Sequence, residues 1–397
     1  MIEFWDIALL LLGAKLGGSI FSRIQQPSII GELIAGIILG SVLGIVVNST
    51  TIQIISQLGA MFLILLTTLS IDFSKIDNNI EKLVVIQIVS AAIIFLILLG
   101  ISMFMGMNLN LSLVVAVAIF GSSTTIAART LMAMDAINSS EGQTIIGLQI
   151  VNGIIELLLI LAVINMLQEH TFNIEPLIKL VLMIIGTFVV MSRVGYRFIN
   201  RIFNYAQKFK MEEVLLAFTL VLTFTAAALA EKAGVTSFLG VMLVGMLISK
   251  TPQALIITQK VKELGESFFI PIFFASIGLG VSMIGLAGNL EFLTILMVAI
   301  IVIRLAAFII PIRLMGCSGV ESLKIGSGLL SMSEYGLLIM SIGIAYKVLD
   351  VTFYSVFVII FLLINIFSPF VVKMVFKIKS TGYKRTWRRR RRSRFLI

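Results

Sequence analysis

Long uninterrupted apolar stretches constrain this chain more than any other feature of its sequence. They run for about twenty residues, the length that an α-helix needs to cross a hydrocarbon core of ~30 Å. They are rich in Leu and Ile and lack the period-two alternation of membrane β-strands. Of the 397 residues only 13% are charged, where a soluble domain would carry about 25%. The sequence therefore predicts an all-α polytopic membrane protein and excludes a water-facing globular fold.

The apolar stretches divide into about thirteen candidate transmembrane helices. No connection between them is long enough to hold a soluble domain. We therefore expect one membrane domain over residues 1–379, followed by a polybasic tail at 380–397. The expected spans are 5–21, 28–47, 54–72, 83–104, 111–133, 143–167, 175–192, 213–230, 235–250, 266–287, 291–315, 323–347 and 351–372.

The distribution of Lys and Arg predicts the orientation of these spans. If the C-terminus is cytoplasmic, thirteen spans place the N-terminus outside, and 25 of the 30 basic residues then lie on the inner side. We expect a multi-pass protein of the cell membrane in this orientation. The tail carries eight basic residues between Lys384 and Arg394. At the inner membrane surface such a cluster is expected to bind anionic lipid headgroups, at about 1 kcal/mol per residue, rather than nucleic acid.

A weak internal repeat becomes visible when the sequence is shifted by 209 residues. Each match pairs spans that are seven apart, and because seven is odd, the two copies cross the membrane in opposite directions. Inverted-topology repeats, here roughly 28–167 and 235–376, are typical of secondary transporters. The matching segments are Gly31–Gly36 with Gly240–Gly245, Phe62–Leu65 with Pro271–Phe274, and Gly121–Thr125 with Leu330–Glu334.

Four spans carry their most polar residues near their centres. Glu156, Arg304 and Glu334 lie at or next to the centres of the sixth, eleventh and twelfth spans, and the segment 121–125 lies at the centre of the fifth. An ionisable group at this depth costs at least ~2.5–3.5 kcal/mol, so its presence indicates a function. These residues are therefore our candidates for a transport site near the middle of the membrane.

The residue types at this depth suit a small cation. Asn152 and Glu156 are one helical turn apart and face the same way, and Gly153 leaves space beside them. Amide and carboxylate oxygens are hard ligands. Ser123 and Thr124 belong to a Gly-Ser-Ser-Thr-Thr segment that can unwind at depth if its carbonyls line a polar cavity. We expect Glu156, Asn152, Ser123 and Thr124 to bind the ion or the proton, with Glu156 and Asn152 as the main ligands of the transported monovalent cation.

Arg304 cannot release its proton at any relevant pH, so it is expected to act with Glu334 as a fixed charge balance. Proton binding must then fall to the carboxylates. Two arrangements remain open. Glu156 and Arg304 form a structural buried pair, or Glu334 pairs with Arg304 and leaves Glu156 free for the transported ion.

One segment resembles the second-helix signature of monovalent cation/proton antiporters of the Kef-type and NapA-like branch: residues 26–40, QPSIIGELIAGIILG. The resemblance extends over nearly the whole membrane part of the chain. It implies an NhaA-like antiporter fold and a homodimeric elevator-type exchanger, with two crossed broken helices at the fifth and twelfth spans. Further matching segments are Ser122–Thr124, Gly240–Gly245, Pro271–Leu279 and Ser333–Gly336.

The resemblance also locates the ion-binding pair, at Asn152 and Gly153, and the basic residue, at Arg304. Relatives usually carry an aspartate at the position of Gly153. Glu156, one turn further along the same helix, is the substitute carboxylate that the sequence offers. If Glu156 substitutes, the site is displaced by about one turn, ~5 Å.

These observations lead to a principal hypothesis and two alternatives. The principal one is a secondary antiporter that exchanges Na⁺ or K⁺ for H⁺ by an elevator-type alternating-access mechanism. The alternatives are an organic-anion carrier that uses Arg304, and a transport-inactive sensor or partner protein. An enzyme is not expected, because the chain has neither a His-based metal motif nor a Gly-x-Ser-x-Gly elbow. No nucleotide- or NAD-binding domain follows the membrane part, so ligand-gated regulation of the Kef type is not expected. No cofactor is expected either.

Overall fold

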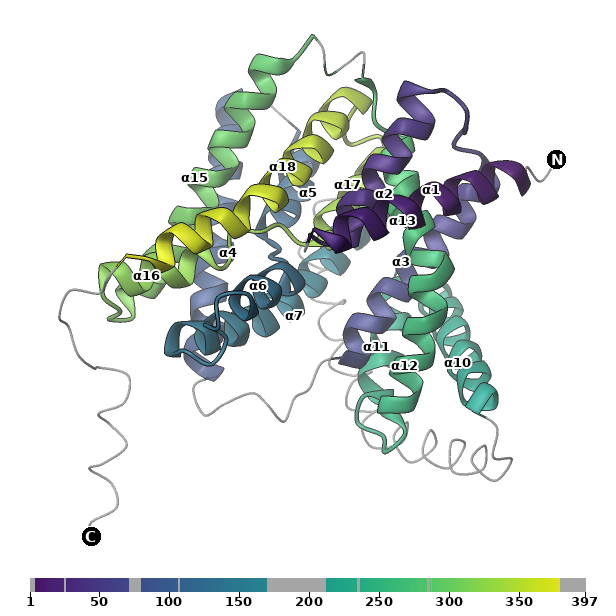
Figure 1. The fold of residues 1–397 in the computed structure, drawn as a ribbon, viewed down its shortest axis with the longest axis horizontal. Coiled ribbons are helices and arrows are strands. Elements are labelled where there is room, and N and C mark those ends of the chain that lie inside the picture. Colours follow the sequence, from purple (N-terminus) through teal and green to yellow (C-terminus); the bar gives the residue numbers. More distant parts are fainter. Residues whose placement is uncertain are drawn as a thin grey trace. The chain divides into compact units, whose positions relative to one another are not determined.

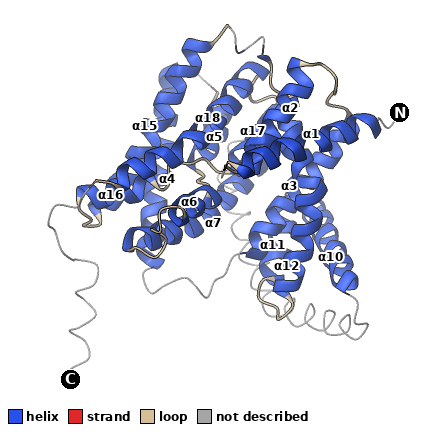
Figure 2. Ribbon diagram, in the orientation of Figure 1, coloured by secondary structure: helices blue, strands red, loops and turns tan. Residues whose placement is uncertain are grey.

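The fold comes from a computed structural model, which describes residues 4–24, 26–70, 80–105, 108–169, 212–233, 236–283, 286 and 288–378. In these ranges every regular element is a helix (Figures 1 and 2). Seven of the described helices are long and apolar enough to cross a membrane, and four more are shorter but apolar. The prediction of an all-α polytopic membrane protein is confirmed at this level. The expected span 175–192 and the tail 380–397 lie outside the described residues.

The chain divides into two compact units, and each is described by itself. The first comprises Met1–Lys75 and Leu158–Met283, and the second comprises Ile76–Leu157 and Ile284–Ile397. The first unit contains α1 (Phe4–Arg23), α2 (Ser28–Ile37), the π-helix η1 (Ile38–Val42), α3 (Thr50–Ser70), α10 (Glu212–Lys232), α11 (Ser237–Ile248), α12 (Ala254–Leu264), the π-helix η4 (Gly265–Phe269) and α13 (Ile270–Leu279). The second contains α4 (Ile80–Met105), α5 (Leu109–Phe120), α6 (Thr124–Met132), α15 (Leu290–Leu314), α16 (Gly319–Ser327), α17 (Glu334–Ala345), α18 (Val351–Phe376) and most of α7 (Ser140–Glu169).

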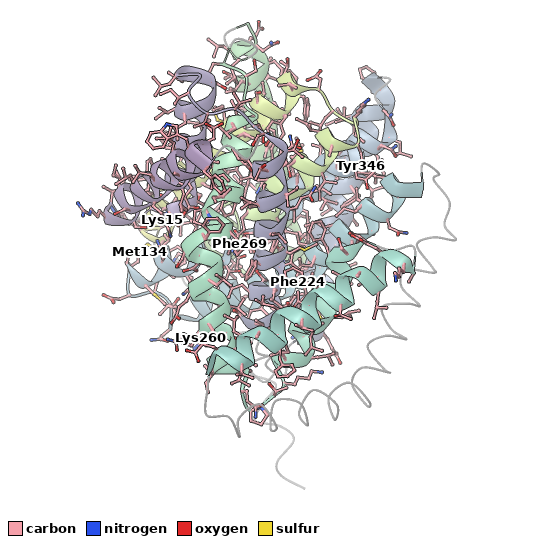
Figure 3. All side chains as sticks on the ribbon, turned by 90° about the vertical axis from the view of Figure 1, so that its right-hand side faces the viewer. Lys15, Met134, Phe224, Lys260, Phe269 and Tyr346 are labelled. Carbon is pink, nitrogen blue, oxygen red and sulfur yellow. The ribbon has the colours of Figure 1, made fainter. Side chains whose placement is uncertain are left out.

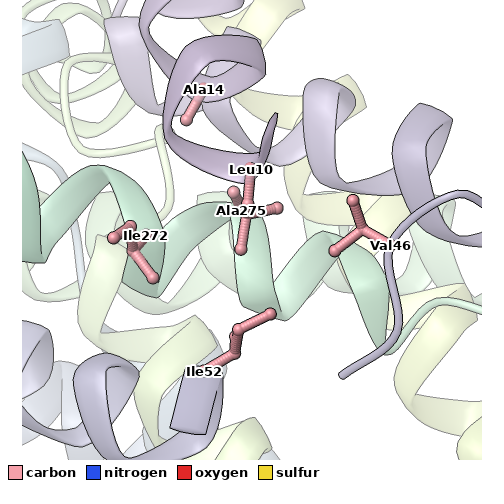
Figure 4. Close-up of a cluster of buried hydrophobic side chains, with 6 residues drawn as sticks. All are labelled: Leu10, Ala14, Val46, Ile52, Ile272 and Ala275. Atoms are coloured by element: carbon pink, nitrogen blue, oxygen red, sulfur yellow. The ribbon is translucent and has the colours of Figure 1, made fainter. Parts of the chain in front are cut away.

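The first unit is held together by apolar packing around α13. Six fully or nearly buried side chains from α1, α3, α13 and the segment after η1 converge in one cluster (Figure 4). Nearby, Phe269 of η4, labelled in Figure 3, stacks on Phe62 of α3 with ring centroids 4.7 Å apart. The members of the cluster are Leu10, Ala14, Val46, Ile52, Ile272 and Ala275.

Glycines let the helices of this unit approach one another at backbone distance, as small residues do in membrane proteins. In α2, a Cβ atom on Gly31 would overlap the carbonyl oxygen of Gly17 in α1. Five residues later, a Cβ atom on Gly36 would overlap the carbonyl oxygen of Ala275 in α13. The glycine spacing of α2, which the sequence presents as a motif, is therefore required by its two neighbours.

We expect Gly36→Val to lower the thermal unfolding midpoint of the purified protein, because the valine side chain meets the backbone of α13, which cannot rotate away. Overpacking of this kind typically costs ~1–3 kcal/mol. The control is Gly100→Ala in α4, where no atom lies within 4 Å of the added carbon and alanine favours the helix. A Gly36→Val protein as stable as the Gly100→Ala protein would contradict the close packing of α2 on α13.

In the second unit, two of the expected spans are each a pair of short helices. The span expected at 111–133 is α5 followed by α6, and the span expected at 323–347 is α16 followed by α17. A capping box of Ser318 and Glu321 starts α16, and the Asp350 side chain accepts a hydrogen bond from the Phe353 N–H at the start of α18. Capping side chains therefore help to set the residues at which these helices begin, which insertion into a membrane does not specify.

The span expected at 266–287 differs from the structure at both ends. A continuous helical segment runs from Ala254 to Leu279 through α12, η4 and α13. Its first part carries two ion pairs along the helix, Lys260 with Glu263 and Lys262 with Glu266. Hydropathy marks where a helix enters the apolar layer, and this helix begins well before that point.

Candidate functional site

The two interrupted helices of the second unit meet at their breaks. Ser122 and Met332 form an isolated antiparallel β-bridge. The Ser123 N–H donates to the Ser331 carbonyl oxygen at 3.3 Å, and the Ser333 N–H donates to the Gly121 carbonyl oxygen at 3.2 Å. Each break thus satisfies some of the backbone groups that the other leaves unpaired, which non-helical backbone at membrane depth requires.

Serine side chains cap the helices that leave the breaks. Ser123 precedes α6, and its hydroxyl oxygen accepts from the Ile126 N–H at 3.5 Å. Ser333 precedes α17, and its hydroxyl oxygen accepts from the Tyr335 N–H at 3.2 Å. The crossing therefore brings together two positive helix N-termini, of α6 and α17, and two negative helix C-termini, of α5 and α16.

Arg304 of α15 binds the two negative ends. Its side chain is fully buried and lies 5.5 Å from the centre of the Phe308 ring. A guanidinium group has five N–H donors, and here five hydrogen bonds go to backbone carbonyl oxygens at the two breaks, four of them at 2.7–3.1 Å. The positive charge and the donor geometry both suit the ends of α5 and α16. The acceptors are Ile119, Gly121, Leu329, Leu330 and Ser331.

This arrangement bears on the two pairings that the sequence left open. None of the ion pairs found among the described residues joins Arg304 to Glu156 or to Glu334. Arg304 acts electrostatically on Glu156, but its hydrogen bonds go to the backbone. In the described structure neither carboxylate is a direct partner of the guanidinium group.

Asn152 of α7 holds the first break. It is fully buried, and its Oδ1 accepts from the Ser122 N–H at 2.8 Å. Its Nδ2 donates to Oε1 of Gln87 at 3.2 Å and to the Phe120 carbonyl oxygen at 3.4 Å. The Asn152 amide, which we expect to be an ion ligand, thus also stabilises the backbone at the crossing. Its Oδ1 keeps a second lone pair that can accept another bond.

Glu156 lies one turn further along α7 and is 1% exposed. Its Oε1 occupies the space that a Cβ atom on Gly121 would need, so the carboxylate packs against the first break. The Ser333 hydroxyl of the second break is its hydrogen-bonding neighbour, and Arg304 and Glu334 are the charges that act on it. Its Oε1 has no hydrogen-bond partner. A buried carboxylate oxygen without a partner is costly, and it offers a ligand to a cation or a proton.

The structure places the other predicted site residues around the same crossing. Thr124 is the first residue of α6 and is exposed. Glu334 is the first residue of α17, where its charge complements the positive end of that helix. At Gly153, no atom beyond the local helix backbone lies within 4 Å of the position of a Cβ atom, so there is room for a side chain.

Three polar residues at the crossing were not among those predicted from the sequence. Gln149 of α7 donates from Nε2 to the Ser122 hydroxyl at 2.9 Å and to the Gly328 carbonyl oxygen at 3.3 Å. Gln87 supports Asn152, and Asn365 of α18 bonds to the second break. All three are uncharged side chains inside apolar spans, which is the signal that could have identified them.

Comparisons with known proteins show which family and fold the chain resembles. The family model described as sodium/hydrogen exchanger, transmembrane, matches residues 8–378. The Na(+)/H(+)-K(+) antiporter GerN of Bacillus cereus is 24% identical, with 96% of this chain and 98% of that protein covered. An Na(+)/H(+) antiporter of Enterococcus hirae is 26% identical, with 94% and 98% covered. The solved sodium proton antiporter MjNhaP1 from Methanocaldococcus jannaschii has a similar fold, with a TM-score of 0.73, 15% identity, and 94% and 97% covered.

Neither of the alternative functions gains support. The matching relatives named above are antiporters. An organic-anion carrier would need free donors on Arg304, and all five are bonded to backbone carbonyl oxygens.

Proposed function

Because the chain belongs to the transmembrane sodium/hydrogen exchanger family, a family of transporters, we propose that it exchanges Na⁺ or K⁺ for H⁺ across the cell membrane. The observation that carries the proposal is the buried, unpartnered Oε1 of Glu156 at the crossing of two interrupted helices. In a site of this kind, a cation and a proton compete for one carboxylate. The cation is released when the carboxylate is protonated, and the reverse exchange follows when the proton leaves.

The residues around Glu156 have distinct parts in this mechanism. Asn152 offers the second lone pair of Oδ1, and Ser123 and Thr124 offer oxygen atoms at the first break. Arg304 neutralises the negative ends of α5 and α16, so that the carboxylate remains available to the ion. Glu334 adds negative charge near the crossing and balances the fixed positive charge.

We further propose alternating access by an elevator motion of an NhaA-like fold. Its support is that the crossing, Glu156 and Arg304 all lie within one of the two compact units, as a moving transport domain requires. An exchanger of this type is a homodimer, multi-pass in the cell membrane. The basic residue distribution favours an outer N-terminus and a cytoplasmic C-terminus, with the tail at 380–397 bound to anionic lipid.

We place the inverted repeats at 28–167 and 235–376, within a membrane domain of residues 1–379. Two equivalent helix contacts in the first unit support this repeat. A Cβ atom on Gly240 of α11 would overlap the carbonyl oxygen of Ala226 in α10. Gly31 and Gly17 make the same contact between α2 and α1. Both members of the pair are displaced by the same 209 positions. A repeat that conserves contacts as well as residues is the expected result of a duplicated fold.

Proton flux in proteoliposomes tests the proposed exchange. The protein is reconstituted with an internal pH dye, and Na⁺ or K⁺ is added outside, with an equal concentration of choline as the control. We expect the internal pH to rise, because entering cations are exchanged for leaving protons. We also expect the apparent KM for the cation to rise as the pH falls, because protons compete for the same carboxylate. Correctly inserted protein that gives the choline response at every pH and cation concentration would refute the proposal.

A further inference from the structure

Asn365 makes both hydrogen bonds of its side-chain amide to one residue of the second break. It lies within α18 and is 1% exposed. Its Oδ1 accepts from the Met332 N–H at 2.7 Å, and its Nδ2 donates to the Met332 carbonyl oxygen at 3.1 Å. The amide therefore satisfies both polar groups of a backbone residue that lies outside any helix.

Asn365 and Asn152 occupy equivalent places around the crossing. Asn152 Oδ1 accepts from the N–H of Ser122, and Ser122 is the partner of Met332 in the β-bridge. Asn152 follows Ser122 by 30 residues, and Asn365 follows Met332 by 33 residues. Each residue of the bridge is thus hydrogen-bonded to an asparagine from the next long helix in the sequence, in α7 for Ser122 and in α18 for Met332.

The two bonds to Met332 also constrain its neighbour in the chain, Ser333. Ser333 is the next residue in the chain, caps α17 and presents its hydroxyl to Glu156. If Met332 loses both bonds, two backbone groups are left unpaired at membrane depth, and the extended segment must move to find new partners. Ser333 would then leave its place beside the carboxylate.

We propose that Asn365 is a positioning residue of the exchange site, which sets the affinity for the transported cation by holding Met332 and, through it, Ser333 beside Glu156. This inference rests on the proposed exchange and deepens it. Both of these side-chain hydrogen bonds go to Met332, so Asn365 acts through the second break.

The apparent KM for Na⁺ and K⁺ tests the inference, measured by proton flux for Asn365→Ala and Asn365→Gln. Loss of a buried hydrogen-bond partner is expected to raise the KM about tenfold in Asn365→Ala. Asn365→Gln keeps both polar atoms but displaces them by one methylene, so a smaller rise is expected. The matched control is Ser368→Ala on the same helix. Its buried hydroxyl bonds to the carbonyl oxygen of Asn365 within the helix, and we expect a KM within about twofold of wild type.

A double-variant experiment separates positioning of Ser333 from a general loss of stability. In a Ser333→Ala background the hydroxyl is already absent, so Asn365→Ala should change the KM by less than about twofold. The same fold-change in both backgrounds, or folded Asn365 variants with a wild-type KM, would overturn the inference. If Asn365→Ala does not fold, Asn365→Gln decides between these outcomes.

Hydrogen exchange distinguishes failure of this inference from failure of the proposed function. If wild-type protein shows no cation-dependent flux, the exchange proposal has failed. The hydrogen-exchange rate of the Met332 N–H then shows whether Asn365 holds the second break in place. Exchange at least about tenfold faster in the Asn365 variants supports this role, and an unchanged rate overturns it.

Discussion

Glu156→Gln is expected to abolish cation-dependent proton flux while the protein folds and inserts normally. Glutamine has nearly the same shape, so it fills the same space against Gly121. It can neither release a proton nor carry the negative charge that a bare cation requires. The measurement is the initial rate of internal pH change after addition of Na⁺ or K⁺, compared between wild type and variant at equal protein density. We expect a reduction of at least about 10²-fold.

The matched control is Glu334→Gln, which removes the other carboxylate at the crossing. Glu334 is the first residue of α17 and is partly exposed. We expect exchange to persist there with an altered apparent KM. Cation-coupled flux that survives in Glu156→Gln and disappears in Glu334→Gln would reverse the two roles. Flux that survives in both variants would show that neither carboxylate carries the proton.

Arg304→Met is expected to cause the largest loss of stability of any single substitution at the crossing. Methionine fills much of the same volume, but it removes five hydrogen bonds to backbone carbonyl oxygens. The carbonyl oxygens of Gly121, Leu329 and Ser331 keep a second donor, whereas those of Ile119 and Leu330 lose the donor that the described structure gives them. Each unpaired buried group costs about 1–3 kcal/mol, and water or backbone movement recovers only part of this. We expect the thermal unfolding midpoint in detergent to fall by more than about 5 °C.

Two further variants show which property of Arg304 matters. Arg304→Lys keeps the charge but has three donors on a single atom, so it should recover only part of the lost stability. Arg313→Met removes an exposed arginine of the same helix that bonds to one carbonyl oxygen, that of Cys317. We expect its midpoint to stay within about 2 °C of wild type. An Arg304→Met protein that unfolds at the wild-type temperature would show that the crossing does not depend on the guanidinium group.

Much of the architecture was predictable because the membrane imposes simple length and polarity rules. A run of about twenty apolar residues has few alternatives to a spanning helix, so α1, α3, α4, α10 and α18 follow from composition. The same rules drew attention to Glu156 and Arg304, because ionisable groups at that depth are rare. Helix ends were less predictable. The helix through α12 and α13 begins outside the apolar run, where hydropathy carries no signal.

The fold class, the depth of the polar residues and Glu156 as the candidate carboxylate could all be predicted from the pattern of residues. The partners of Arg304, Asn152 and Asn365 became apparent only from the folded arrangement. Apart from Gln87, which bonds to Asn152, these partners are backbone carbonyl and N–H groups of two breaks that are about 200 residues apart in the chain. Every residue carries the same backbone groups, so no pattern of side chains could indicate which of them would be left unpaired. That depended on where two helices stop, and on their stopping at the same place.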